Sequence, residues 1–155
     1  MKLDTQPPKP SVLGRSLLLV NGDLAFTGND LTPVVDRDNF VQALQVMIET
    51  PMGSDVFNVS YGFDLLNCLS APASVSFIKD LIRLNIVKSI SLDDRVREIK
   101  EIVFNDEPRF FEMNPGLNQE DELQSRKDDR RWQAVVVLQT IAEGDVAVGL
   151  EGRAR

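Results

Sequence analysis

The segment RWQAVVVLQTIAEGDVAVGLEG constrains the fold more than any other stretch of the sequence. Two runs rich in valine flank Glu143-Gly144, and β-branched runs on either side of such a turn predict a β-hairpin. Alternation in the first run puts Val135, Val137 and Ile141 on one side, and Trp132, Ala134, Val136, Leu138 and Thr140 on the other. Both sides are largely apolar, so neither face is expected to lie in water. The fold must therefore cover this hairpin twice, with helices on one face and with the N-terminal segments or another chain on the other.

A second hairpin is predicted where SLLLVNGDLAF places Asn21-Gly22 between two short apolar runs, since both turn positions need positive φ. About four amphipathic helices are predicted between the two hairpins. The first follows a cap at Asp38, a short apolar one contains Cys68, the third follows Ser70, and the fourth follows a Ser91–Asp94 capping box. The apolar face of the first helix consists of Phe40, Ala43, Leu44, Met47 and Ile48. The predicted class is α+β, with a small mixed sheet from the N- and C-terminal hairpins packed against these helices.

Proline content separates one end of the chain from the rest. Residues 1–14 contain Pro7, Pro8 and Pro10, which predicts a flexible, extended arm without a core of its own. Residues 15–155 are predicted to form a single domain, because this length can bury one hydrophobic core.

Composition removes several classes of function. The net charge of −7 and the lack of a basic cluster argue against nucleic acid as a partner. The sequence has no histidine, which excludes Ser-His and Cys-His catalysis and most transition-metal sites. Its one cysteine, Cys68, cannot form an internal disulfide and is interpreted as a small core residue. No apolar run reaches the ~20 residues of a membrane helix and no secretory signal pattern is present, so a soluble, cytoplasmically made protein without a cofactor is expected.

The stretch NDEPRFFE, residues 105–112, is the most chemically loaded part of the sequence. Pro108 is predicted to end the fourth helix and to force Glu107 into an extended conformation. Glu107 and Arg109 would then project to the same side as a two-pronged charged fork, with Phe110 and Phe111 anchored in the core below it. Such a fork suits docking onto helices of a partner, because arginine binds carboxylates and terminal carbonyls in a bidentate way. The alternative is a turn between elements whose charges simply face water.

The order of three stretches points to a known family. They are GDLAFTGNDLTPVVDRDN, then DRDNFVQALQVMIETPMGSDVFNVSYGFDLL, then DDRVREIKEIVFNDEPRF, and together they span about residues 22–112. This order resembles the contractile-tail baseplate wedge proteins of phages, the gene-twenty-five-like family. Relatives of that family occur in type VI secretion baseplates and in extracellular contractile injection systems.

The resemblance implies a structural role in an assembled tail or injection particle. It places the contact with a helical core bundle, built by two larger wedge subunits, on Glu107, Pro108 and Arg109. It also implies that the C-terminal sheet receives a strand from the first ring of sheath subunits, with Val146 and Val148 as candidate contacts. Several copies per particle, six by analogy, and neighbouring tube or hub proteins follow from the same likeness. No nucleic acid, membrane, metal or cofactor is implied.

Some alternatives stay open at this point. The likeness does not distinguish a phage tail from a bacteriocin or an injection system, and it leaves the oligomeric state of the free protein undetermined. The charged segment 118–131 and the proline-rich arm depart from a minimal family member, which leaves the exact sheath contacts open. A lysozyme-like glycoside hydrolase acting on peptidoglycan is the second hypothesis, because that reaction needs two carboxylates and no histidine. Asp106, Glu107 and Glu112 would be its candidate acids, although no spacing singles out a pair.

Overall fold

The computed structural model describes residues 11–64, 68, 74–117, 131–142 and 144–153. The chain divides into two compact units, Met1–Gln42 and Ala43–Arg155. Helices and antiparallel strands occur together, so the predicted α+β class is confirmed. Among the described residues, no helix is long and apolar enough to cross a membrane. Residues 1–10 of the predicted arm and all of the charged segment 118–131 except Arg131 lie outside the described residues.

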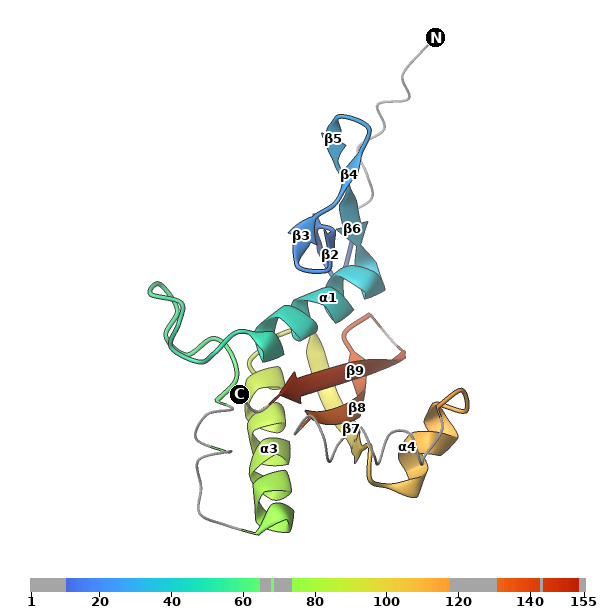
Figure 1. The fold of residues 1–155 in the computed structure, drawn as a ribbon. Coiled ribbons are helices and arrows are strands. Elements are labelled where there is room, and N and C mark those ends of the chain that lie inside the picture. The colour runs from blue at the N-terminus through green and yellow to red at the C-terminus, as the bar shows by residue number, and fades with distance from the viewer. Residues whose placement is uncertain (1–10, 65–67, 69–73, 118–130, 143, 154–155) are drawn as a thin grey trace. The chain divides into compact units, whose positions relative to one another are not determined.

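The first unit consists of short antiparallel strand pairs followed by the start of a helix (Figure 1). The pairs are β1 (Arg15–Leu17) with β6 (Pro33–Val35), β2 (Leu19–Val20) with β3 (Asp23–Leu24), and β4 (Phe26–Thr27) with β5 (Asp30–Leu31). Asn21 and Gly22 join β2 to β3 with φ of 53° and 85°, which confirms the predicted Asn-Gly turn. Within the described residues these strands pair only with one another, so the predicted mixed sheet from both hairpins is wrong.

Helix α1 (Asp36–Glu49) forms where its apolar spacing predicts a helix, although it begins at Asp36 rather than after Asp38. In the first unit, Asn39 Nδ2 donates to the Leu13 carbonyl at 2.9 Å, so the helix start is tied to the turn before β1. The residues predicted for its apolar face are buried, with Ala43 half-buried: Phe40, Leu44, Met47 and Ile48.

The second unit is built on a three-stranded antiparallel sheet in the order β7-β8-β9. Its strands are β7 (Val96–Phe104), β8 (Arg131–Thr140) and β9 (Asp145–Arg153). Strands β8 and β9 form the predicted C-terminal hairpin, with Gly144 at φ +141° in the turn. Strand β8 lies between β9 and β7, so β7 supplies the third strand of the sheet.

Strand β7 replaces the helix that the sequence predicts after Ser91. The predicted helical stripe consists of Leu92, Val96, Ile99 and Val103, and Val96, Ile99 and Ile102 likewise recur every third position. Register shifts between Val96 and Glu98, and again between Ile99 and Glu101, insert extra residues into the strand. Each bulge turns the chain over by one residue, so all three apolar side chains stay on the same face of the sheet. The helix-like spacing therefore belongs to a bulged strand, and the prediction of a helix here is wrong.

One face of the sheet is covered within the second unit, whereas the described residues cover the other only in part and leave Ala147, Gly149 and Glu151 exposed. One face carries buried Trp132, Val136 and Leu138 of β8 together with Val146 and Val148 of β9. Helix α3 (Val75–Ile90) contacts β7 and buries an isoleucine stripe, Ile82, Ile86 and Ile90. The other face carries Val135, whose cover includes the short helix α4 (Pro108–Met113).

The cap of helix α3 differs from the prediction, and the position of Cys68 agrees with it. Ser74, not Ser70, caps α3, because its Oγ accepts a hydrogen bond from the Phe77 amide at 3.3 Å. Ser70 itself lies outside the described residues. Cys68 is helical and buried, with Asn85 Nδ2 3.1 Å from its Sγ, so its interpretation as a core residue is confirmed.

Candidate partner-binding site

The Glu107–Pro108–Arg109 segment connects strand β7 to helix α4. The Glu107 amide donates to the Phe104 carbonyl at 2.9 Å, which closes a turn directly after the strand. Glu107 is extended, with φ −97° and ψ 137°, as expected for a residue before proline. Pro108 occupies the first turn of α4, where its missing N–H leaves no donor unsatisfied. Proline therefore starts a helix here, and the prediction that it ends one is wrong.

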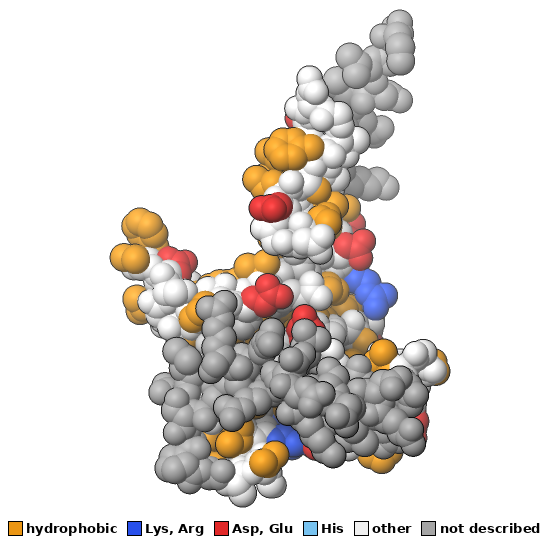
Figure 2. All heavy atoms as spheres, viewed as in Figure 1, with side chains coloured by type: hydrophobic (Ala, Val, Ile, Leu, Met, Phe, Trp, Pro, Cys, Tyr) orange, Lys and Arg blue, Asp and Glu red, His pale blue; other side chains and the backbone are white. Residues whose placement is uncertain are grey.

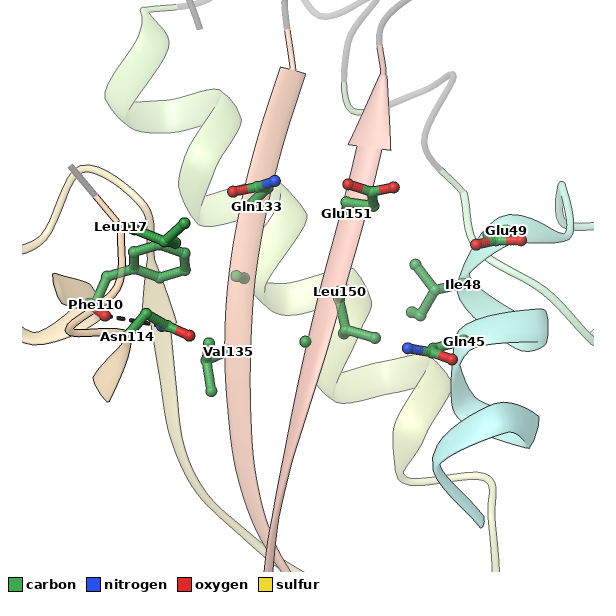
Figure 3. Close-up of a pocket in the computed structure, with 12 residues that line it drawn as sticks. Gln45, Ile48, Glu49, Phe110, Asn114, Leu117, Gln133, Val135, Leu150 and Glu151 are labelled. Atoms are coloured by element: carbon green, nitrogen blue, oxygen red, sulfur yellow. Dashed lines mark hydrogen bonds between the residues drawn. The ribbon is translucent and has the colours of Figure 1, made fainter. Parts of the chain in front are cut away.

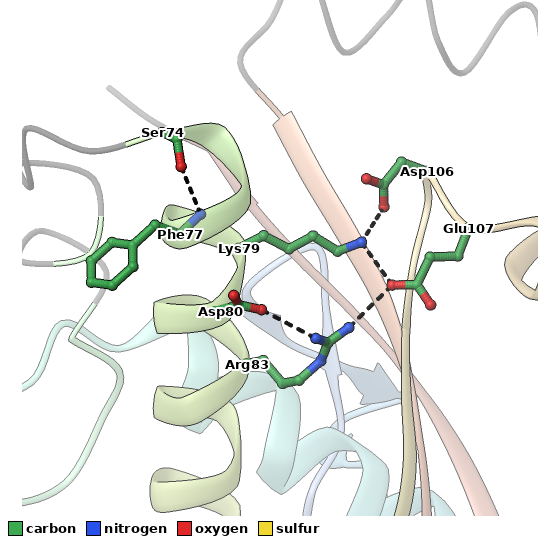
Figure 4. A network of polar contacts seen from close by, with 7 residues as sticks. All are labelled: Ser74, Phe77, Lys79, Asp80, Arg83, Asp106 and Glu107. Carbon is green, nitrogen blue, oxygen red and sulfur yellow. Dashed lines mark hydrogen bonds and ion pairs between the residues drawn. The ribbon is translucent and has the colours of Figure 1, made fainter.

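Glu107 is held by two cations of helix α3 (Figure 4). Its Oε1 lies 2.7 Å from Lys79 Nζ and 3.1 Å from Arg83 Nη2. Lys79 also binds the Asp106 carboxylate at 2.8 Å. These pairs join α3 to the turn after β7, with all four side chains between 24% and 39% exposed.

The two cations also lie over an aromatic ring. Lys79 Nζ is 5.0 Å and Arg83 Cζ is 5.2 Å from the centroid of Phe104, within cation–π range. Burial alone would lower the pKa of Lys79, but its hydrogen bonds to Asp106 and Glu107 outweigh that effect and raise it. Lys79 and Arg83 are the residues that the sequence reasoning missed. Their spacing of four on one helix face was the available signal.

Arg109 points to different partners from Glu107. Its Nε lies 3.4 Å from Glu101 of β7, and its Nη1 lies 3.1 Å from Glu112 of α4. Its side chain is 56% exposed, and the hydrogen bond to Glu112, with Glu101 nearby, raises its pKa further above the ordinary value. The prediction that Glu107 and Arg109 project together from one extended segment is wrong, because Arg109 already belongs to the helix. Glu107 faces inward to α3, and Arg109 remains accessible.

The phenylalanines anchor the segment as predicted. Phe110 is buried with Val103 and Val135, and Phe111 packs against that cluster. The two rings meet edge to face, with centroids 5.5 Å apart. Asn114 ends the helix, and its Nδ2 donates to the Phe110 carbonyl at 2.8 Å. The base under Arg109 is therefore fixed to the sheet.

The candidate hydrolytic acids lie in this same region, but each is engaged. Asp106 and Glu107 share Lys79, and Glu112 binds Arg109. A catalytic acid of a glycosidase needs an apolar pocket that favours its protonated form. All three carboxylates instead pair with a lysine or arginine side chain. Within the part of the chain that the structure describes, no cluster of three or more His, Cys, Asp or Glu side chains could hold a metal ion.

The candidate sheath contacts, Val146 and Val148, lie on β9 at the edge of the sheet, with both side chains buried. The Thr140 amide donates to the Gly144 carbonyl, which fixes which β9 residues bond to β8. Antiparallel alternation then directs the N–H groups of Val146 and Val148 toward β8. The outward N–H groups of the edge belong to Ala147, Gly149 and Glu151, which the sequence alone did not identify.

A cavity of about 360 Å³ lies over this edge (Figure 3). Phe110 and Asn114 bound it at the α4 end, and Gln45 and Ile48 bound it on α1. Between them it is lined by residues of β8 and β9, namely Gln133, Ala134, Val135, Gly149, Leu150 and Glu151. The outward edge of β9 is therefore next to a space with both polar and apolar walls.

Comparison with known proteins gives no assignment. No model of a known protein family matches the chain, and no curated protein matches it either.

Proposed function

We propose that this chain is a structural baseplate wedge subunit of a contractile tail or injection particle. In this proposal, the Glu107–Pro108–Arg109 segment clamps the core bundle of the larger wedge subunits, and the β9 edge attaches the first sheath ring. The observation that carries the proposal is the position of Arg109. It is an exposed guanidinium on a short helix whose next residue, Phe110, is buried in the core.

In the proposed contact, the three residues have different tasks. Glu107 braces the turn against α3 through Lys79 and Arg83. Pro108 sets the start of α4, so that the following side chain emerges at a defined place. Arg109 makes the contact, because exposed ion pairs such as those with Glu101 and Glu112 exchange readily for a partner's carboxylates or terminal carbonyls.

The edge of β9 supports the second half of the proposal. An added strand gains its register from main-chain hydrogen bonds, and the outward N–H groups of Ala147, Gly149 and Glu151 are placed to donate them. Val146 and Val148 contribute indirectly, since their buried side chains hold β9 on the core.

Co-expression with the larger wedge subunits of the same particle tests the bundle contact. Arg109→Ala is expected to keep the wild-type melting temperature and to lose co-purification. Arg97→Ala is the matched control, because it removes the same charge from an exposed position on β7. Normal co-purification of Arg109→Ala, or equal loss in both variants, would refute the contact. Clearing of peptidoglycan that is abolished by Glu107→Gln would instead favour the hydrolase.

A further inference from the structure

The loop between Pro51 and Phe63 presents apolar side chains to solvent. Val56 is 84%, Phe57 101% and Val59 65% exposed. Apolar side chains gather at the tip of this loop in the space-filling view (Figure 2). A fully exposed phenylalanine beside two exposed valines buries little apolar surface against the described residues, and such patches mark interaction sites.

The base of the loop is held firmly. The Phe63 amide donates to the Thr50 carbonyl at 2.8 Å, and the Met52 amide donates to the Phe63 carbonyl at 3.1 Å. Gly62 lies so close to the backbone of Thr50 and Met52 that only glycine fits at this position. Ser89 of α3 adds a further tie, because its buried Oγ donates to the Gly62 carbonyl at 3.0 Å.

The tip is ordered by its own hydrogen bonds. Asp55 Oδ1 accepts from the amides of Phe57 at 2.9 Å and Asn58 at 3.3 Å, as in an Asx turn. The Tyr61 amide donates to the Asn58 carbonyl at 3.0 Å, which closes the far side. The loop therefore holds Phe57 outward before any partner arrives, and the ordering cost of binding is reduced.

The surroundings of the tip are acidic. The sequence from residue 38 to residue 78 contains no lysine or arginine, whereas it contains Asp55 within the tip itself. Arg95, which lines the hollow beside the loop, is already bound by Asp93 at 2.6 Å. Burial first, and then the negative charge of Asp93 and Asp55, raises the pKa of Tyr61 at the foot of the loop. An anionic membrane is a poor partner for such a tip, because membrane-inserting segments pair their apolar side chains with lysine and arginine.

We propose that the tip formed by Val56, Phe57 and Val59 is a preformed plug that docks into an apolar pocket with a basic rim on another protein. Phe57 fills the pocket, the two valines seal its mouth, and Asp55 faces the rim. This inference stands on the loop alone and does not depend on the proposed wedge function.

Binding to designed peptides tests the chemistry of the partner. The probe is a fluorescently labelled amphipathic helix of leucine and lysine, and its counterpart of leucine and glutamate has the same apolar face with an acidic rim. The wild-type chain is expected to bind the lysine peptide and not the glutamate peptide. Phe57→Ser should weaken binding roughly tenfold or more, the effect of withdrawing one buried aromatic side chain. Phe26→Ser is the matched control, because Phe26 is 66% exposed on strand β4, away from the loop, and it should bind like wild type.

Several outcomes would overturn the inference. They are absent binding of the lysine peptide, equal binding of both peptides, and equal affinity of Phe57→Ser and wild type. Binding to phosphatidylglycerol vesicles that disappears with Phe57→Ser would assign the loop to membranes instead. Phe57→Ser should also melt like wild type, since the side chain is fully exposed. A lower melting temperature would show that Phe57 supports the fold and is not a free plug.

Discussion

Gly62→Ala is expected to destabilise the protein far more than Gly53→Ala, although both glycines lie in the same loop with positive φ. Gly62 has φ +107° and Gly53 has φ +81°, so alanine at either position costs about 1–2 kcal/mol of backbone strain. A Cβ on Gly62 would lie 2.5 Å from the Thr50 carbonyl oxygen and 3.0 Å from the Met52 nitrogen. At Gly53 the nearest atom, the Val59 oxygen, is 4.0 Å away.

The collision at Gly62 involves backbone atoms, which cannot turn aside as a flexible side chain can. The Thr50 carbonyl also accepts the hydrogen bond from the Phe63 amide, so displacing this carbonyl weakens the contact that closes the base of the loop. Forced displacement of packed structure costs about 1–3 kcal/mol more. The expected loss in free energy of unfolding is therefore about 2–5 kcal/mol for Gly62→Ala and about 1–2 kcal/mol for Gly53→Ala.

Urea unfolding followed by tryptophan fluorescence measures both values. Trp132 is the single tryptophan of the sequence, and its ring centroid is 5.9 Å from that of Phe63, directly after Gly62. Losses for the two variants that agree within about 0.5 kcal/mol would refute the close approach at Gly62.

Three further predictions concern the second unit. Phe110→Ala should lower the free energy of unfolding by about 3 kcal/mol in urea titrations, because it empties the cluster beneath α4; a loss below about 1 kcal/mol would contradict its anchoring role. Ala147→Pro should fold and, under the proposed function, lose sheath attachment, whereas Val148→Pro should unfold the hairpin, because only the N–H of Val148 faces β8. Melting curves and imaging of particles distinguish the two variants, and equal stability of both would refute the assignment. Burial alone would raise the pKa of Asp93, but hydrogen bonds from Arg95 outweigh it and hold the pKa below its ordinary 3.8. The ionised Asp93 carboxylate thus stabilises the fold above its ordinary pKa, and this stabilisation is lost as pH falls through the folded pKa. In urea titrations, the difference in free energy of unfolding between wild type and Asp93→Asn should shrink below about pH 4 and should not shrink above it.

Local patterns determined a large part of this fold. The valine runs around Gly144 predicted the β8–β9 hairpin, and Asn21-Gly22 predicted the turn between β2 and β3. The spacing of apolar residues predicted α1, whose Phe40 and Leu44 are fully buried. Each of these features depends on neighbours in the sequence, namely turn residues with positive φ or apolar side chains on one helical face. Residues that are close together in the sequence therefore suffice to predict these features.

Tertiary structure decided what depends on residues far apart in the chain. The stretch with the predicted helical stripe, which includes Val96 and Ile99, becomes a bulged strand because β8 offers an unpaired edge with a matching apolar face. Glu107 and Arg109 are close in sequence but have different partners. Glu107 pairs with Lys79 and Arg83 of α3, whereas the helix that begins at Pro108 directs Arg109 away from α3. Hydrogen bonding along a strand and charge pairing between elements are set by packing partners. No pattern within NDEPRFFE by itself names those partners.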